Sequence, residues 1–209
     1  MRSYFFVNPW WLRRFYSKAT FSIPTTEGTI YLTFDDGPDP EVTPWVLKHL
    51  EEHNAKASFF LIGQRVKDYP DIVEEIIAKG HAIGNHTYSH VNGWKVDNQK
   101  YFDEVDQCSK ALKAFTTKNL FRPPYGRIRL NQLSNLTSEG YKVIMWSHLS
   151  GDFDPALDLD KSLSALTKAT SGSVLVFHDS KKASQNLKEL LPRVLDHFST
   201  LRYSFKSIT

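Results

Sequence analysis

The sequence predicts a single α/β domain with a mainly parallel sheet. One observation indicates the fold class and a second indicates the single domain. From Thr29 onward, short runs of β-branched and aromatic residues alternate with stretches of helical periodicity. The 209 residues, 41% of them hydrophobic and 23% charged, suit a single globular domain. Strands that alternate with helices form right-handed βαβ units, which build either an open doubly wound sheet or an incomplete barrel.

The expected strands are short apolar runs bounded by turn residues. In chain order they are Thr29–Phe34, Ala57–Ile62, Ala82–Asn85, Leu120–Arg122, Val143–Trp146, Ser173–Phe177 and Tyr203–Ser207. One helix should begin near Thr43, with Pro44 in its first turn, and a second should start at Asp71 as N-cap and stop at Gly80. Further helices are expected over residues 97–115, 130–138, 160–170 and 183–198.

Residues 1–28 are predicted to be an aromatic-rich extension that packs on a domain formed by residues 29–209. Aromatic residues bury a large area, so we expect them to cover an open end of the core; they are Phe5, Phe6, Trp10, Trp11 and Phe15. Aromatic residues mixed with arginines suit peripheral contact with a membrane surface as an alternative. No small-residue cleavage site follows the apolar run, which disfavours a signal peptide and favours a cytoplasmic or membrane-peripheral location.

Composition excludes several classes of protein. The net charge of +3 is mild and the basic residues are scattered, so a nucleic-acid partner is not expected. No stretch is long and apolar enough to span a bilayer. Cys108 is the single cysteine, which excludes an intrachain disulfide or a cysteine-rich zinc site, and its apolar-periodic surroundings predict a core position.

Polar residues follow successive predicted strands. These are Asp35 and Asp36 after the first strand, His86 and His90 after the third, Arg122, Pro124 and Tyr125 at the end of the fourth, Asp152 after the fifth and His178 after the sixth. The carboxyl ends of parallel strands share one rim, where α/β proteins bind ligands. These side chains are therefore expected to converge, although they are far apart in the chain.

Two imidazoles and one carboxylate form a common catalytic zinc set that leaves a position open for water. His86 and His90 are spaced so that one helical turn would place both on the same face. Either Asp35 or Asp36 could supply the carboxylate, which leaves the other to take a proton from water.

A base on one side of a substrate requires an acid on the other. His178 is the best candidate, because an imidazolium can protonate a leaving amine near neutral pH. Asp152 is placed to raise the pKa of His178, and Arg122 is placed to hold an aspartate ionised. A backbone N–H near Tyr125 could stabilise a developing oxyanion.

The motifs that contain these residues look like the ordered motifs of the polysaccharide deacetylase family, the NodB-homology or carbohydrate esterase family 4 group. They are Thr33–Pro38, His86–His90, Arg122–Gly126 and Val176–His178. The resemblance implies a distorted (β/α) barrel of about seven parallel strands, an incomplete TIM barrel. It also implies Zn²⁺, or another divalent transition metal such as Co²⁺, and deacetylation of chitin-like or peptidoglycan-like polymers of N-acetylglucosamine.

By motif position, the resemblance makes Asp35 the base, and Asp36, His86 and His90 the metal ligands. Arg122 matches the arginine that tethers the base, and His178 matches the acid. Tyr125, preceded by Pro124, matches the residue whose main chain meets the oxyanion.

The fourth motif departs from the family pattern of Asp-x-x-Asp-Trp. Asp152 is kept, but Leu149 replaces the first aspartate and Phe153 replaces the tryptophan, so the groove wall is expected to differ in shape from the family pattern. Val176 stands where leucine is usual, so the pocket for the acetyl methyl group should be slightly wider. Trp94 follows the histidine pair and could either stack on a sugar ring or pack in the core.

Two rival functions remain open at this stage. The same metal site could serve an O-acetyl esterase on a glycan or a hydrolase of a C–N bond in a small molecule. A non-catalytic glycan-binding module is disfavoured, because such a module should have lost catalytic residues and none is missing here.

Overall fold

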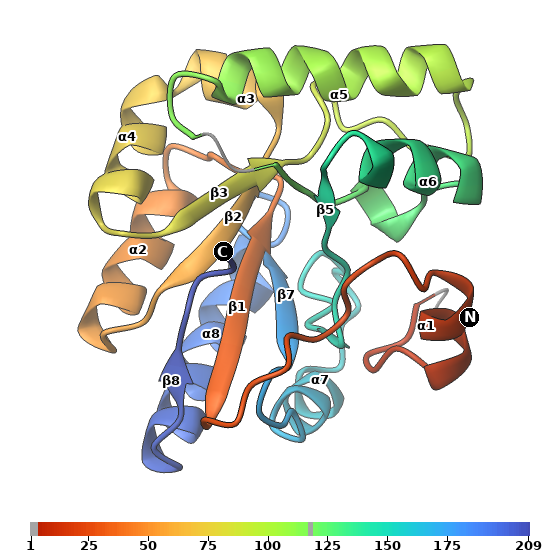
Figure 1. Ribbon diagram of the computed structural model, residues 1–209. Coiled ribbons are helices and arrows are strands. Elements are labelled where there is room, and N and C mark those ends of the chain that lie inside the picture. The colour runs from red at the N-terminus through yellow and green to blue at the C-terminus, as the bar shows by residue number, and fades with distance from the viewer. Residues whose placement is uncertain (1–3, 117–118) are drawn as a thin grey trace.

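A computed structural model describes residues 4–116 and 119–209, and its centre is a curled parallel sheet (Figure 1). The strands are β1 (Thr29–Asp35), β2 (Ala57–Leu61), β3 (Ala82–Asn85), β4 (Leu120–Phe121), β5 (Lys142–Val143), β6 (His148–Leu149), β7 (Val174–His178) and β8 (Ser204–Phe205). Their order across the sheet is β5-β4-β3-β2-β1-β7-β6, and β8 pairs with the start of β1. All of these pairings are parallel. Strands β1 to β5 lie side by side in chain order and the sheet is curled, which confirms the predicted incomplete barrel over the open doubly wound alternative.

Helices connect most strands and cover the outer face of the sheet. They are α1 (Trp10–Phe15), α2 (Val42–Glu52), α3 (Gly63–Asp68), α4 (Pro70–Ala78), α5 (Asn98–Leu112), α6 (Leu130–Ser138), α7 (Leu159–Leu166) and α8 (Ser184–Thr200). Apolar residues at helical spacing, such as Leu187, Leu191 and Val194 of α8, are fully buried against the sheet. Burial of these faces drives the association of the two layers.

The two faces of β1 have different roles. Successive side chains in a strand point to opposite faces. Leu32 and Phe34 pack in the cluster that includes residues of α2 and α8, whereas Tyr31 belongs to a separate cluster with residues of β2, β4 and β7. Thr33 and Asp35 share the face of Tyr31, so the period of the strand directs a hydroxyl and a carboxylate into the barrel interior.

Several local predictions need correction. The expected fifth strand at Val143–Trp146 is wrong beyond Val143: β5 ends there, and a separate strand, β6, begins at His148 on the opposite edge of the sheet. Helix α3 was not foreseen, because six residues are too few for a periodic signal. Asp71 is not an N-cap but lies in the first turn of α4, behind Pro70. Cys108 is buried in the core, as predicted.

The N-terminal extension runs along both edges of the curled sheet, and its first three residues lie outside the described part. At the β6 edge, the Leu149 N–H donates to the Phe6 carbonyl at 2.8 Å. At the β5 edge, Thr20 donates to the Val143 carbonyl at 2.8 Å and accepts from Met145 N–H at 2.7 Å. These bonds occupy backbone groups that an open edge would leave unpaired.

The expectation that the N-terminal aromatic side chains cover the core is wrong for most of them. The exposed fractions are 61% for Phe5, 76% for Trp10, 45% for Trp11 and 67% for Phe15, while Phe6 is half-buried. The backbone of the extension covers the sheet edges, and these four rings face solvent. Among the described residues, no helix combines the length and the apolar character needed to cross a bilayer.

Candidate active site

The predicted site residues converge on one pocket at the carboxyl ends of β1, β3 and β7. The cavity has a volume of about 400 Å³. Eight of the predicted residues line it: Asp35, Asp36, His86, His90, Tyr125, Phe153, Val176 and His178. Arg122, Asp152 and Pro124 are buried, while Trp94 lies outside the lining.

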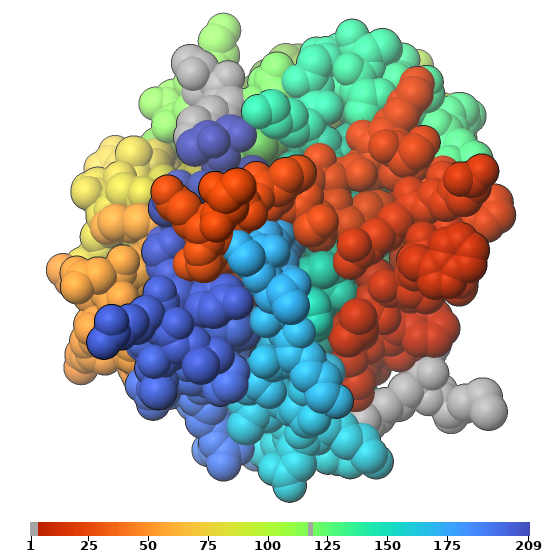
Figure 2. Space-filling model, turned by 60° about the horizontal axis from the view of Figure 1, so that its bottom comes forward, coloured from red at the N-terminus to blue at the C-terminus, as the bar shows by residue number. Residues whose placement is uncertain are grey.

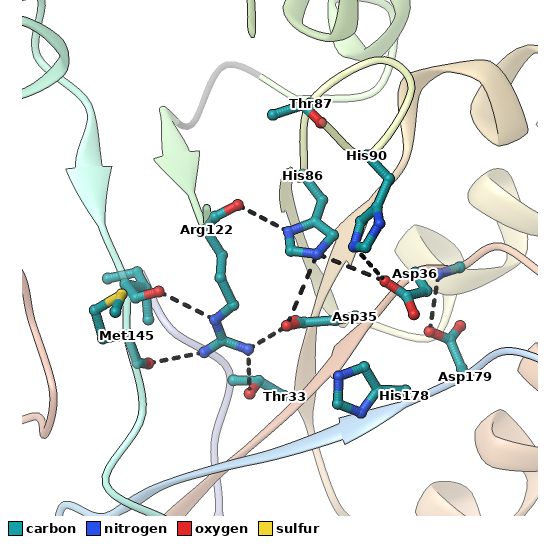
Figure 3. Close-up of polar contacts among 12 residues, drawn as sticks. Thr33, Asp35, Asp36, His86, Thr87, His90, Arg122, Met145, His178 and Asp179 are labelled. Carbon is teal, nitrogen blue, oxygen red and sulfur yellow. Dashed lines mark hydrogen bonds and ion pairs between the residues drawn. The ribbon is translucent and has the colours of Figure 1, made fainter. Parts of the chain in front are cut away.

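Asp36, His86 and His90 form a cluster suited to a metal ion. One ligand atom from each lies within 4.8 Å of the others. The Nε2 atoms of His86 and His90 are 3.6 Å and 3.1 Å from Asp36 Oδ1. Figure 3 shows both rings directed toward this carboxylate. This buried oxygen accepts no hydrogen bond from any described residue. An unsatisfied buried carboxylate oxygen facing two imidazoles is costly without a cation, so the cluster fits a divalent metal.

Backbone contacts select the tautomer of His86. Its Nδ1 is 2.8 Å from the Arg122 carbonyl oxygen, which can only accept, so Nδ1 must carry the hydrogen. Burial lowers the pKa of His86 to about 4, against the opposing effect of Asp35, so the ring is neutral near pH 7. The lone pair of Nε2 is therefore directed toward Asp36, as a metal ligand requires. Burial alone would raise the pKa of Asp36, but His90, His178 and His86 together hold it below its ordinary value.

The two histidines do not lie on a helical turn, contrary to the sequence prediction. Residues 86–90 form a loop in which Thr87 and His90 have φ values of 63° and 60°. Asp36 also has a positive φ, 78°. Left-handed conformations are rare and unfavourable for non-glycine residues, and a folded protein retains them only where surrounding contacts impose them.

The contacts that impose the His86–His90 loop come from α5. The Glu104 carboxylate is buried and accepts hydrogen bonds from Ser89 N–H at 2.7 Å and from the Ser89 hydroxyl at 2.9 Å. Asn85 caps the loop from the other end, since its Oδ1 accepts from Thr87 N–H at 2.8 Å. Glu104 of α5 therefore holds one end of the His86–His90 loop, and Asn85 at the end of β3 holds the other.

Asp179 supports the loop that carries Asp36, and sequence analysis missed this residue. It is completely buried, and its carboxylate accepts from Gly37 N–H at 3.1 Å and from the Thr43 hydroxyl at 2.6 Å. Burial raises the pKa of Asp179 well above its ordinary value. A Cβ on residue 37 would collide with the Asp179 carboxylate, so glycine is required at this position. The only sequence signal was a position directly after His178.

Arg122 crosses the barrel interior to reach Asp35. Its guanidinium donates to Asp35 Oδ1 and to the Thr33 hydroxyl, each at 2.7 Å, and to the carbonyls of Ile144 and Met145 at 3.0 and 2.9 Å. Burial lowers the pKa of Arg122, and the charge of Asp35 opposes this shift. Thr33 and Asp35 can both be reached because they lie on the same face of β1 (Figure 3).

His178 and Asp152 form a buried pair on the opposite side of the pocket. Asp152 accepts from His178 Nδ1 at 2.7 Å and from His178 N–H at 2.8 Å. Burial alone would lower the pKa of His178, but the adjacent Asp152 outweighs it and raises the pKa to about 9. Because Asp152 occupies Nδ1, the Nε2 of His178 is the nitrogen available to a substrate.

The remaining predicted residues separate into three groups. Tyr125 is 61% exposed, has a φ of 61° and places its ring 4.6 Å from the His90 ring, while Pro124 is buried beneath it. Val176 and Phe153 line the pocket, with the Phe153 ring edge-on to His178. Trp94 does not reach the pocket: its Nε1 donates to a loop carbonyl, and its ring contacts the guanidinium of Arg127, which does line the cavity.

Tyr4 is a second residue that sequence analysis missed. It belongs to the N-terminal extension, yet it lines the pocket, and its hydroxyl donates to Asp154 Oδ2 at 2.8 Å. Its ring lies edge-on to Phe153, with centroids 5.3 Å apart. Lys182 completes this wall, with its ammonium 5.8 Å from the Phe153 ring centroid. No local pattern near Tyr4 indicated a site, because the contact joins residues about 150 positions apart.

The comparisons with known proteins agree with this geometry. The family description "polysaccharide deacetylase" matches residues 22–144, which is more than half of the chain. The protein belongs to the polysaccharide deacetylase family. This family is metal-dependent, and Asp36, His86 and His90 form a possible metal site in this member.

Relatives in the family resemble the chain over most of its length. A peptidoglycan-N-acetylglucosamine deacetylase of Bacillus cereus is 38% identical over 160 residues, which are 76% of this chain and 58% of that protein. The chain thus spans little more than half of that relative. A chitooligosaccharide deacetylase of Azorhizobium caulinodans is 34% identical over 160 residues, 75% of this chain and 76% of that protein.

A solved deacetylase has the same fold. The crystal structure of a peptidoglycan N-acetylglucosamine deacetylase with 4-naphthalen-1-yl-N-oxidanyl-benzamide is 33% identical and has a TM-score of 0.86. The match covers 96% of this chain and 95% of the other. Because the match covers nearly all of this chain, it includes most of the N-terminal extension.

Proposed function

We propose that this protein removes acetyl groups from N-acetylglucosamine units of a peptidoglycan-like or chitin-like glycan, with Zn²⁺ as the metal. The observation that carries the proposal is that an Asp-His-His cluster, a tethered aspartate and an aspartate-paired histidine all face one pocket. The relatives named as deacetylases of peptidoglycan and of chitooligosaccharides support this substrate class.

Zinc is favoured because two imidazoles and one carboxylate are its usual ligands in catalytic sites. Asp36, His86 and His90 would hold it. When bound, the ion lowers the pKa of a coordinated water to about 7 and polarises the acyl carbonyl. Co²⁺ accepts the same ligand types and is the main alternative metal.

Asp35 has the position of the general base. Its Oδ1 is held by Arg122, while its Oδ2 lies 4.0 Å from His86 Nε2, beside the ligand cluster. An ionised carboxylate at this place can take a proton from the attacking water. Arg122 pairs with the carboxylate and fixes its orientation, so Arg122 acts as a positioning residue.

His178 has the position of the general acid. With the pKa raised to about 9, its ring is protonated near neutral pH and can donate a proton to the leaving amine nitrogen. Asp152 holds the ring through Nδ1, so the proton leaves from Nε2. The backbone N–H of Tyr125, at the pocket mouth, would stabilise the negative charge that develops on the acetyl oxygen.

The decisive experiment measures acetate release from chitooligosaccharides, peptidoglycan and acetylated xylan, with and without a chelator. We expect release from the N-acetylglucosamine substrates, loss of activity with chelator and recovery with Zn²⁺. In Asp35→Asn the zinc content should stay unchanged while the rate falls about 10²–10⁴-fold, the usual contribution of a general base. Asp36→Ala should lose the metal.

Other outcomes would redirect the proposal. Acetate release from xylan alone would assign the site to O-acetyl esters. No release from any substrate by the zinc-loaded protein would favour a glycan-binding module. Full activity in Asp35→Asn would reject that residue as the base.

A further inference from the structure

The N-terminal extension presents an unusual amount of apolar surface to solvent. Phe5, Val7, Trp10, Trp11 and Phe15 are all exposed, and within α1 the rings of Trp11 and Phe15 contact each other edge to face. Other exposed large apolar side chains of the described residues are spread over residues 69–201. A concentration of exposed aromatic residues in one short segment marks an interaction site rather than ordinary surface variation.

The segment that carries these exposed side chains is anchored to the barrel by hydrogen bonds. Val7 forms an antiparallel bridge with His148, and Asn8 donates from its backbone N–H to Ser147 at 3.0 Å and from its side chain to the Trp146 carbonyl at 2.6 Å. After α1, the Tyr16 hydroxyl donates to Ile128 at 3.1 Å. Because the inward-facing residues are fixed to the barrel, the outward-facing rings are held in solvent. Figure 2 shows the extension, in red, as a continuous area along one side of the molecule.

Positive charge is concentrated in the same segment. The first 26 residues of the chain contain four basic and no acidic residues, whereas the remainder contains 22 basic and 23 acidic residues. Arg13, Arg14 and Lys18 are exposed in or just after α1. Across residues 4–116 and 119–209, no carboxylate forms an ion pair with Arg13 or Arg14. Arg13, Arg14 and Lys18 therefore place positive charge on the surface that also carries the exposed aromatic rings.

We propose that residues 5–18 form a docking surface for an anionic lipid bilayer. Trp10, Trp11 and Phe15 would enter the headgroup layer, where aromatic side chains are favoured, and the arginines would meet lipid phosphates. Charge complementarity selects this partner: two copies of the surface would repel each other, and a neutral sugar chain would not require the arginines. The surface begins one residue from Tyr4, so docking would hold the pocket close to the bilayer.

Vesicle binding by the full chain tests this proposal independently of deacetylase activity. We expect cosedimentation with phosphatidylcholine vesicles that contain phosphatidylglycerol, little with phosphatidylcholine alone, and weaker binding at high salt. Arg13→Gln with Arg14→Gln should weaken binding to the anionic vesicles roughly twenty-five-fold, from about fivefold for each charge. Trp10→Ser with Trp11→Ser should weaken it at least tenfold and reduce the fluorescence shift that vesicles produce.

Matched controls change exposed residues elsewhere on the molecule. Leu201→Ser removes an exposed apolar side chain, and Lys48→Gln with Lys161→Gln removes two exposed charges. Both controls should bind vesicles as the wild type does, and circular dichroism should show all variants folded. Wild-type-like binding by the arginine variant, or no binding by the unmodified chain, would overturn the proposal. A dimer that Trp10→Ser with Trp11→Ser converts to monomer would assign the surface to a second copy and would also overturn it.

Discussion

The two walls of the pocket are built in different ways. On the metal side, Asp35, Asp36 and the histidines are held by buried side chains, namely Arg122, Asp179 and Glu104. On the other wall, Tyr4, Phe153 and Lys182 meet mainly through ring edges and a cation over a ring, and they come from the extension and from loops. The titratable groups of the pocket are thus held by buried hydrogen bonds, whereas the side chains of the other wall meet mainly through weaker ring contacts.

Removing Arg122 should produce the largest effect, because it is the buried partner of Asp35 on the metal side. Arg122→Met leaves the buried charge of Asp35 unpaired, so we expect a loss of about 3–5 kcal/mol in the free energy of unfolding, measured by urea denaturation. Activity of the remaining folded protein should also be lost. Arg193→Met, on the exposed side of α8, serves as control and should change stability little. Equal stability of the two variants would contradict a stabilising role for the ion pair between Arg122 and Asp35.

Asp179 supports the loop that carries Asp36 but is not one of the candidate metal ligands. Its removal tests whether this support affects the affinity for the metal. Asp179→Ala leaves Gly37 N–H and the Thr43 hydroxyl without an acceptor. We expect zinc affinity to fall about 10–100-fold, the usual effect of losing a supporting contact behind a ligand, as measured by chelator competition. Asp196→Ala, on the protein surface, should keep full affinity. Unchanged affinity in Asp179→Ala would show that the loop needs no such support.

The His178–Asp152 pair should set the alkaline limit of activity. Because the pKa of His178 is raised to about 9, the acid is protonated below that pH, and activity must fall as pH rises through the pKa. A bound dication lowers this value, so the limit in the zinc enzyme should lie below 9. The stabilisation from the pair should likewise be complete below about 6.5 and lost as pH rises toward 9.

Asp152→Asn tests this limit directly. The variant removes the charge that raises the pKa, so the alkaline limb should move at least about one pH unit lower. Titration of the metal-free protein by NMR should show the same downward shift for the His178 resonance. An identical titration midpoint in the two proteins would reject Asp152 as the cause.

The smallest effect is expected on the wall formed by Tyr4, Phe153 and Lys182. Tyr4→Ala removes a ring from the pocket lining, and we expect KM for oligosaccharides to rise about threefold to tenfold with kcat nearly unchanged. Tyr4→Phe keeps the ring and should behave more nearly as the wild type. Phe5→Ala is the matched control, because the adjacent ring faces solvent. A fall in kcat with constant KM would place Tyr4 among the groups that act in the chemical step.

The sequence by itself determined the parallel α/β fold and most of the candidate site. Strand and helix periodicity revealed where most of the elements lie, and polar residues after the strands revealed which rim would hold the pocket. These features are local, since a strand directs its last residues to the same rim wherever it lies in a parallel sheet. Arg122 could therefore be expected to meet an aspartate at this rim, whereas its hydrogen bond to Thr33 was not foreseen.

Only the tertiary structure decided how distant segments meet. It divided residues 142–149 between opposite sheet edges, shaped the His86–His90 loop through α5 and placed Asp179 behind Gly37. It also turned Tyr4 into the pocket and the neighbouring aromatic rings into solvent. These outcomes depend on contacts between residues far apart in the chain, and local periodicity carries no information about which partner a side chain will find.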